Sequence, residues 1–194
     1  EPTVRPRLPE LIGALTQIEG VESLSMTTNG VLLPRLAAPL KDAGLQRVNV
    51  SLDTLDDAKF NRLTRRDKFA AVWEGILEAE RVGLTPIKLN AVVVRGYNDM
   101  DVVDLARLTL ERDWQVRFIE MMPFAGIADF QVAQVVGQAE MMARIEEALG
   151  NLTPLHEGKL DGEARIYRLS GAKGEVGFIS SVTAAFCAAC TRAR

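Results

Sequence analysis

The last nine residues, FCAACTRAR (186–194), contain both cysteines of the chain. Cys187 and Cys190 form a CxxC pair, and Arg192 and Arg194 follow at alternate positions. Thiolates at this spacing bind zinc or an iron–sulfur cluster, and they also form redox disulfides. Arginine carries a permanently charged, planar fork that suits phosphate or purine recognition. The motif therefore predicts a metal or cluster site beside an anion site, with inert packing and a solvated tail as the alternatives.

The spacing of the cysteines does not decide between these metals. A zinc site needs four ligands, and the single histidine, His156, has no matching partner nearby. A thioredoxin-like pair normally lies near the start of a βαβ unit, whereas this pair follows a predicted hairpin. An iron–sulfur cluster held by three cysteines would leave one iron open for substrate. Cluster, zinc and packing all stay open on spacing alone.

Two predicted strands carry polar side chains on one face only. In RVNVSLD (47–53) and PIKLNAVVV (86–94), apolar residues alternate with polar ones. Parallel strands that are covered on both faces read as nearly continuous apolar runs. Two polar-lined strands therefore predict a wet cavity that holds a ligand, and an exposed sheet edge is the alternative. The polar faces contain Arg47, Asn49, Ser51 and Asp53 on the first strand and Lys88 and Asn90 on the second.

Polar residues also gather where the predicted strands end. Barrel enzymes carry their sites at the carboxyl ends of the strands, where the loops converge. Ordinary turn chemistry is the alternative, and it is preferred for the dipeptide Asn29-Gly30. The residues at these ends are Thr27, Thr28 and Asn29, then Ser51 and Asp53, then Glu120 and Met122.

The elements that must position these residues alternate along the chain. Apolar spacing predicts helices over 8–18, 34–44, 56–83 with a break near 64–67, 100–112 and 138–149, and strands over 22–26, 47–53, 86–94 and 115–121. The stretches ARIYRLSG (164–171) and EVGFISSV (175–182) predict an antiparallel hairpin. Strands that alternate with helices indicate βαβ units and a parallel sheet, open or closed into a barrel.

Composition limits the class of protein. The chain has 194 residues, of which 47% are hydrophobic, so it can bury one substantial core. The net charge of -3 argues against a nucleic-acid platform. No apolar run is long enough for a membrane helix, and the opening EPTVRPRLPE does not resemble a signal peptide, so we expect a soluble cytoplasmic protein with no membrane partner. The first residue, Glu1, and the position of the cysteines predict an internal section of a longer protein.

Five stretches together resemble the GTP 3′,8-cyclase family of molybdenum cofactor biosynthesis. They are SMTTNGVLL, AGLQRVNVSLDTL, GLTPIKLNAVVVRGYND, VRFIEMMPF and FISSVTAAFCAACTRAR, which span nearly the whole chain. These enzymes are radical S-adenosylmethionine lyases with two 4Fe–4S clusters. The resemblance implies an α/β fold with an incomplete parallel (β/α) barrel over 1–122. A C-terminal extension over 123–194 would contain a helix, the hairpin and half of the auxiliary-cluster motif.

The resemblance also implies a reaction and a role for each site residue. In the family, S-adenosylmethionine is cleaved to a deoxyadenosyl radical that takes hydrogen from the ribose 3′ position of GTP, and the sugar radical then attacks C8 of the purine. Ser51 and Met122 would contact S-adenosylmethionine, Thr27 and Lys88 would lie in the nucleotide site, Cys187 and Cys190 would bind the auxiliary cluster, and Arg192 and Arg194 would reach GTP.

Two departures from the family pattern limit what this chain does alone. The N-terminal cysteine triad of the family is absent, and so is the third C-terminal cysteine. We therefore expect the chain by itself to be inactive. A pyranopterin-forming enzyme would act downstream, and a homodimer is left open. Two other functions are retained: a peptide-modifying radical enzyme with an auxiliary cluster, and a degenerate barrel scaffold whose CxxC holds zinc.

Overall fold

The computed structural model describes residues 1–122, 134–156 and 160–184. The chain forms two compact units. The first contains Glu1–Leu52 and Asp56–Leu89, and the second contains Asp53–Leu55 and the residues from Asn90 onward. Among the described residues, no helix is both long and apolar enough to cross a membrane.

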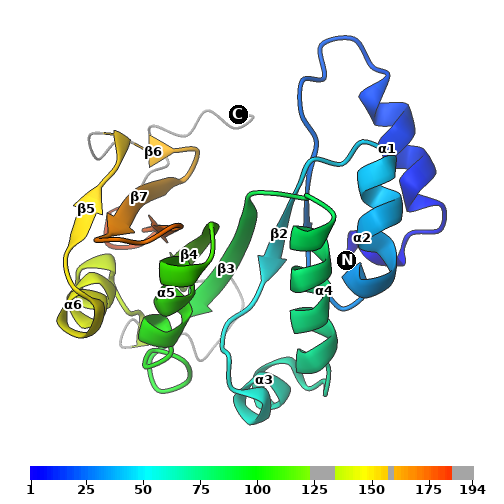
Figure 1. Ribbon diagram of the computed structural model, residues 1–194. Coiled ribbons are helices and arrows are strands. Elements are labelled where there is room, and N and C mark those ends of the chain that lie inside the picture. Colours follow the sequence, from blue (N-terminus) through cyan, green and yellow to red (C-terminus); the bar gives the residue numbers. More distant parts are fainter. Residues whose placement is uncertain (123–133, 157–159, 185–194) are drawn as a thin grey trace. The chain divides into compact units, whose positions relative to one another are not determined.

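The first unit alternates helices with parallel strands (Figure 1). Its elements are the 3-10 helix η1 (Pro2–Val4), α1 (Leu8–Thr16), β1 (Ser25–Thr28), α2 (Leu33–Asp42), β2 (Arg47–Ser51), α3 (Asp57–Thr64) and α4 (Phe69–Arg81). Strand β3 (Ile87–Val93) begins in this unit and continues into the second. Strands β1 and β2 pair in parallel from Ser25 opposite Arg47 to Thr28 opposite Val50.

The core of the first unit lies between its helices and the apolar faces of its strands. Helices α2 and α4 pack closely because position 75 is glycine. A Cβ atom on Gly75 would lie 2.6 Å from the carbonyl oxygen of Gly30 and 2.8 Å from Cβ of Leu33. Burying each Leu, Val or Ile side chain here stabilises the fold by roughly 1.5–3 kcal/mol. The fully buried members include Leu33, Ala37, Leu40, Val48, Val50, Val72, Ile76 and Ala79.

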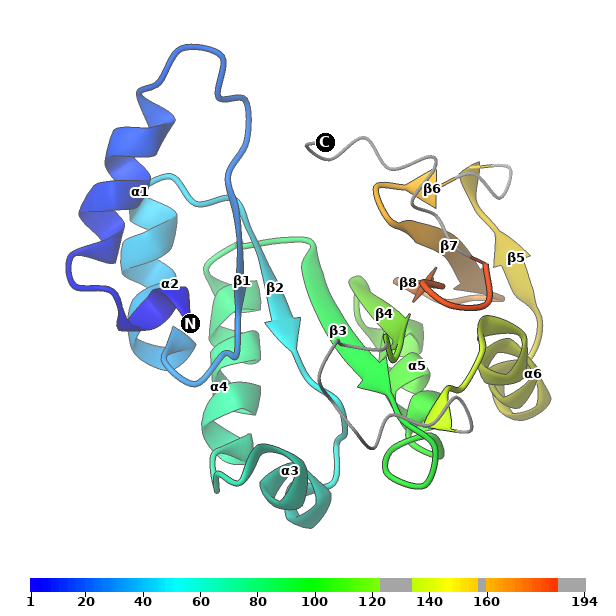
Figure 2. The ribbon, with the colours of Figure 1, turned by 180° about the vertical axis from the view of Figure 1, so that it is seen from behind.

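The second unit contains the rest of β3, α5 (Val102–Glu111), β4 (Trp114–Glu120), α6 (Gln138–Leu149), β5 (Leu152–Pro154), β6 (Leu160–Asp161), β7 (Ala164–Leu169) and β8 (Glu175–Ile179). Its strands follow the order β4-β8-β7-β5, and β6 pairs with β7 (Figure 2). Strand β8 runs parallel to β4, whereas β7 is antiparallel to β8 and β5. The returning chain thus adds β8 directly beside β4.

The two faces of this sheet are packed differently. On one face, the rings of Phe118 and Tyr167 contact the ring of Phe178 at centroid distances of 5.9 and 5.6 Å. The other face holds the cluster of Ala164, Ile166 and Ile179, against which Ile119 and Leu155 pack.

Most of the predicted elements are confirmed. The break in the long helical stretch falls between α3 and α4, helix α6 occupies the predicted 138–149, and β7 and β8 form the predicted hairpin. The prediction of the first strand at 22–26 is wrong in its bounds. The structure has this strand at Ser25–Thr28, because its pairing with β2 begins at Ser25 opposite Arg47 and ends at Thr28 opposite Val50.

Candidate functional site

The face of β1 and β2 that carries polar residues is the accessible one, as the alternation predicts. Thr27 and Ser51 are exposed, whereas Val48 and Val50 on the opposite side are fully buried. The side-chain nitrogen of Asn49 donates a hydrogen bond of 3.2 Å to Oγ1 of Thr27. The structure therefore brings Thr27 and Ser51 onto one polar face of a parallel strand pair, near its carboxyl end.

Strand β3 has the same two-sided pattern. Ile87, Leu89 and Ala91 are buried, whereas Lys88 and Asn90 are half-buried on the other side of the strand. The amide oxygen Oδ1 of Asn90 is enclosed and accepts no hydrogen bond within the described part of the chain. Buried polar atoms normally have a partner, so this oxygen fits a donor group of a bound ligand.

The carboxylate of Glu1 holds the end of β1 in place. It accepts hydrogen bonds from Oγ1 of Thr3 and Oγ1 of Thr28, at 2.6 and 2.7 Å, and from the backbone N–H of Asn29 at 2.7 Å. Burial raises the pKa of Glu1, but the hydrogen bonds from Thr3, Asn29 and Thr28 lower it by more, so the pKa lies below its ordinary value. Glu1 thus keeps a negative charge beside the polar strand end.

Asp53 and Asn98 fasten the loops that follow β2 and β3. Oδ1 of Asp53 accepts the backbone N–H of Val92 at 2.8 Å. The amide nitrogen of Asn98 donates to the carbonyl oxygens of Asp53 and Val92, both at 2.9 Å, and its Oδ1 accepts the N–H of Val94 at 2.8 Å. Burial raises the pKa of Asp53, against a smaller lowering by the Val92 N–H.

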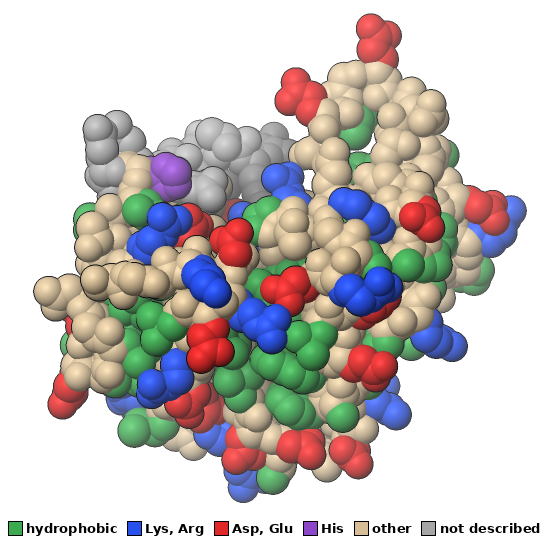
Figure 3. Space-filling model, viewed as in Figure 1, with side chains coloured by type: hydrophobic (Ala, Val, Ile, Leu, Met, Phe, Trp, Pro, Cys, Tyr) green, Lys and Arg blue, Asp and Glu red, His purple; other side chains and the backbone are tan. Residues whose placement is uncertain are grey.

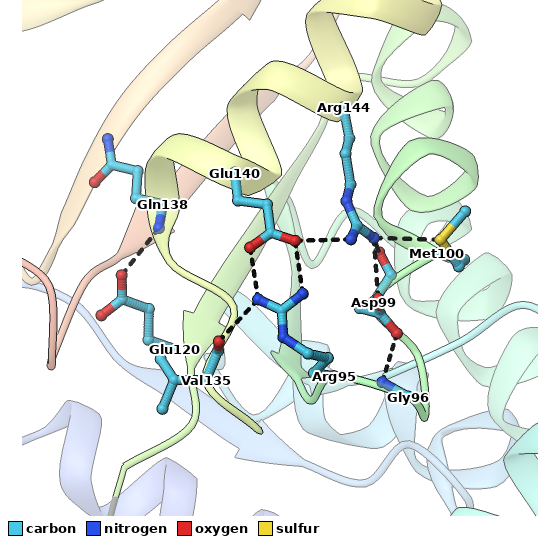
Figure 4. A network of polar contacts seen from close by, with 9 residues as sticks. All are labelled: Arg95, Gly96, Asp99, Met100, Glu120, Val135, Gln138, Glu140 and Arg144. Carbon is cyan, nitrogen blue, oxygen red and sulfur yellow. Dashed lines mark hydrogen bonds and ion pairs between the residues drawn. The ribbon is translucent and has the colours of Figure 1, made fainter. Parts of the chain in front are cut away.

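Glu120, the last residue of strand β4, is fully buried (Figure 4). Its Oε1 accepts the N–H of Gln138 at 3.0 Å and the hydroxyl of Thr183. Its Oε2 accepts the N–H groups of Val182 and Thr183, each at 2.8 Å. Glu120 therefore connects the end of β4, the first residue of α6 and the segment after β8.

An ion-pair network ties the loop after β3 to helix α6 (Figure 4). Arg95 makes paired contacts with Glu140 at 2.9 and 2.6 Å. Arg144 contacts the same carboxylate at 2.7 Å and the carboxylate of Asp99 at 3.1 Å. The pKa of Glu140 is lowered chiefly by the hydrogen bond from Arg95. Arg95 is exposed and Glu140 is partly exposed, so solvent screens their attraction, and we assign the network a structural role.

Charges elsewhere on the molecule are mixed. On the face shown in Figure 3, acidic and basic side chains lie interspersed, in keeping with the net charge of -3. One cation is deeply placed: Arg117 on β4 is 5% exposed and lies 3.6 Å from the carboxylate of Glu163. Gly177 on β8 makes room for it, since a Cβ there would lie 2.9 Å from Cγ of Arg117. Sequence reasoning overlooked Arg117 because its apolar neighbours make the strand look like ordinary core.

The remaining predicted site residues fall into two groups. Met122 follows β4 and is exposed, 42% by area. Cys187, Cys190, Arg192 and Arg194 lie outside the described residues. Within the described part, no three His, Cys, Asp or Glu side chains are grouped to hold a metal ion. The pattern missed Glu1 and Asn98 as well, although Asn98 sits in the turn-forming sequence GYND (96–99).

Comparisons with known proteins identify the family of the chain. The family model "Radical SAM superfamily" matches residues 1–109, and the model "Molybdenum Cofactor Synthesis C" matches residues 114–194. The chain belongs to the radical SAM superfamily, and its fold is a partial barrel of that type. Over its whole length the chain is 45% identical to the GTP 3′,8-cyclases of Pelotomaculum thermopropionicum and Gloeobacter violaceus and 43% identical to that of Moorella thermoacetica. It spans 60%, 59% and 59% of those proteins, respectively.

Two solved structures share the fold at low sequence identity. A radical SAM methyltransferase from Sphaerobacter thermophilus aligns with a TM-score of 0.50 and 22% identity, over 63% of this chain and 36% of that one. The structure of TYW1 with a lysine-pyruvate adduct bound aligns with a TM-score of 0.55 and 20% identity, over 81% of this chain and 51% of that one. Both likenesses concern the fold alone.

Proposed function

We propose that the family-length protein carrying this chain is a GTP 3′,8-cyclase, a lyase that begins molybdenum cofactor biosynthesis in the cytoplasm. The observation that carries the proposal is the uninterrupted similarity: relatives with this name are 40–45% identical over 100% of the chain, and the two family models match it one after the other. GTP is then the substrate, and a pyranopterin-forming enzyme consumes the product. A homodimer is compatible with this function.

S-adenosylmethionine and two 4Fe–4S clusters are the proposed cofactors. When bound, they supply the radical that starts the reaction. Ser51 and Met122 are assigned to S-adenosylmethionine, and Thr27 and Lys88 to the nucleotide. The residues present fit polar ligands: Thr27 and Ser51 are exposed on one polar face, and the enclosed Oδ1 of Asn90 lies on the same side of β3 as Lys88.

The second cluster is assigned to Cys187 and Cys190, with a third thiolate supplied from outside this chain. Two thiols at CxxC spacing form a donor set that suits iron–sulfur chemistry. Arg192 and Arg194 are assigned to GTP, because a guanidinium can make paired hydrogen bonds to phosphate or to the acceptor edge of guanine. We further propose that residues 1–122 form the partial barrel and that residues 123–194 form the C-terminal extension that binds the auxiliary cluster.

The test is made on anaerobically reconstituted, family-length protein. It should convert GTP to the 3′,8-cyclised nucleotide with one deoxyadenosine formed per turnover. Lys88→Met should weaken GTP binding and leave S-adenosylmethionine binding unchanged, because the ammonium contributes charge to the nucleotide site alone. Lys41→Met is the matched control, since Nζ of Lys41 donates to the carbonyl oxygen of Gly83 at 2.6 Å and has no assigned ligand.

Two results would contradict the proposal. If the protein cleaves S-adenosylmethionine but never consumes GTP, the radical chemistry is right and the substrate is wrong. If Lys88→Met weakens both ligands equally, Lys88 supports the barrel and does not bind the nucleotide.

A further inference from the structure

Glu120 accepts hydrogen bonds from the segment that follows strand β8. Strand β8 ends at Ile179, and the following residues form bends. The N–H groups of Val182 and Thr183 donate to Glu120. The hydroxyl of Ser181 donates to the main-chain oxygen of Glu120 at 3.1 Å. One residue of β4 therefore receives hydrogen bonds from three consecutive residues of this segment.

Helix α6 also holds this segment, and we call Glu120 together with its hydrogen bonds to the segment the anchor. The N–H of Gln138 donates to Oε1 of Glu120, and the side-chain oxygen of Gln138 accepts from the hydroxyl of Ser180. A Cβ atom on Gly137 would lie 3.0 Å from Cγ2 of Thr183, so a glycine at this position lets the segment approach the helix closely. The path of residues 180–183 is thus fixed by polar bonds and by close packing.

Glu120 is well suited to this anchoring role. It is fully buried, and a carboxylate is the side chain that only accepts hydrogen bonds, so one residue can receive several backbone N–H groups. The donors around Glu120 are uncharged, and they come from residues 18 to 63 positions away in the sequence. A hydrogen bond to an ionised group is stronger than one between neutral groups. Removing the charge should therefore release the segment without disturbing distant parts of the unit.

We infer that Glu120 is a positioning residue for the auxiliary cluster. Thr183 precedes Cys187 by about four residues, so the bonds from Glu120 fix the point from which the CxxC departs. This inference rests on the proposed function for the role of Cys187 and Cys190. Metal sites need their ligands held by supporting hydrogen bonds, and loss of such support typically lowers metal affinity or activity by about 10- to 100-fold.

The test compares Glu120→Gln with Glu146→Gln in the family-length protein. Glutamine keeps the size of the side chain but turns one acceptor into a donor, which faces N–H or O–H donors at either oxygen position. Glu146 is the matched control because its Oε1 also accepts a backbone N–H, that of Leu152 at 3.0 Å, in the same unit. Thr183→Val removes only the hydroxyl donor and gives a milder variant.

Two readouts are needed. In iron-free protein, amide hydrogen exchange at Val182 and Thr183 should accelerate by roughly ten- to a hundredfold in Glu120→Gln and stay unchanged in Glu146→Gln. In reconstituted protein, the electron paramagnetic resonance spectrum of the second cluster should change or lose intensity in Glu120→Gln. The first cluster should keep its spectrum and its slow cleavage of S-adenosylmethionine without substrate.

If amide exchange at Val182 and Thr183 is unchanged in Glu120→Gln, Glu120 does not hold this segment in place. Faster exchange with an unaltered second-cluster spectrum would overturn the positioning role. If Glu120→Gln does not fold, Thr183→Val decides, and an unaltered second-cluster spectrum in that variant would likewise overturn the role. If the signal of the second cluster survives in Cys187→Ala, the proposed assignment of Cys187 to that cluster is wrong, and the positioning role of Glu120 is then overturned with it. Hydrogen exchange still tests separately whether Glu120 holds residues 182 and 183.

Discussion

Replacing Asn98 should be among the more damaging single changes in the second unit. Asn98 is 2% exposed, and its side chain makes three hydrogen bonds of 2.8 to 2.9 Å to the backbone of Asp53, Val92 and Val94. At about 1 kcal/mol for each bond, Asn98→Ala should lower the free energy of unfolding by about 3 kcal/mol. Urea denaturation followed by circular dichroism measures this loss. The control is Asn151→Ala, an exposed position where a change within about 0.5 kcal/mol is expected.

The isosteric change Asn98→Asp separates hydrogen bonding from packing. Aspartate retains the oxygen that accepts the N–H of Val94, but it places a second oxygen against the carbonyl oxygens of Asp53 and Val92. We expect Asn98→Asp to destabilise the fold at neutral pH at least as much as Asn98→Ala does, although it preserves the side-chain volume. A loss below about 1 kcal/mol for alanine, or a clearly milder effect for aspartate, would refute the assignment of stability to these bonds.

Three further predictions concern packing, pH and substrate. Gly75→Ala should destabilise the first unit by about 1–3 kcal/mol, measured as a lower melting temperature, because the added methyl group meets the backbone of Gly30; a neutral result would show that α4 can move away from α2. Asp53→Asn should be neutral or stabilising at pH 7, because burial raises the folded-state pKa of Asp53 above its ordinary 3.8 and ionisation therefore costs stability. As pH falls from the raised folded-state pKa toward 3.8, Asp53 takes up its proton in the folded protein and the wild type gains stability. The difference in urea midpoint between wild type and Asp53→Asn should therefore shrink over this pH window. A difference that stays constant would contradict this explanation. In family-length protein, Arg192→Ala or Arg194→Ala should weaken GTP binding by about ten- to a hundredfold in a titration, with the iron content of the second cluster unchanged; loss of iron would make these arginines structural.

The alternation of residue types made the polar strand faces predictable. A strand has a side-chain period of two, so RVNVSLD alone shows that Asn49 and Ser51 share a side opposite Val48 and Val50. The break between α3 and α4 could be predicted for a similar reason, because polar and basic residues interrupt the apolar period there. Both signals depend only on residues close together in the sequence, so they can be recognised before the fold is known.

The anchors of the site could not be predicted in the same way. The donors to Glu120 include three backbone N–H groups, which every residue except proline possesses, so no residue type identifies them. Glu1 reaches Thr28 and Asn29 across 27 to 28 positions of sequence, and this contact follows from the placement of β1 beside η1. A residue that acts through backbone partners becomes visible only when the chain has been folded.

The parallel pairing of β8 with β4 has a consequence for how the protein is made. Gln115 pairs with Glu175, so β4 must wait for about 60 further residues to be synthesised before this edge is covered. At roughly 5–20 residues per second, that interval is about 3 to 12 s, far longer than the formation of a helix or hairpin. Five consecutive residues of β4, Trp114–Phe118, are buried in the finished fold, so a strand that needs cover leaves the ribosome with an open edge before β8 has been made. Nascent chains that end between Glu120 and Glu175 should therefore be the forms most prone to aggregate and most dependent on chaperones.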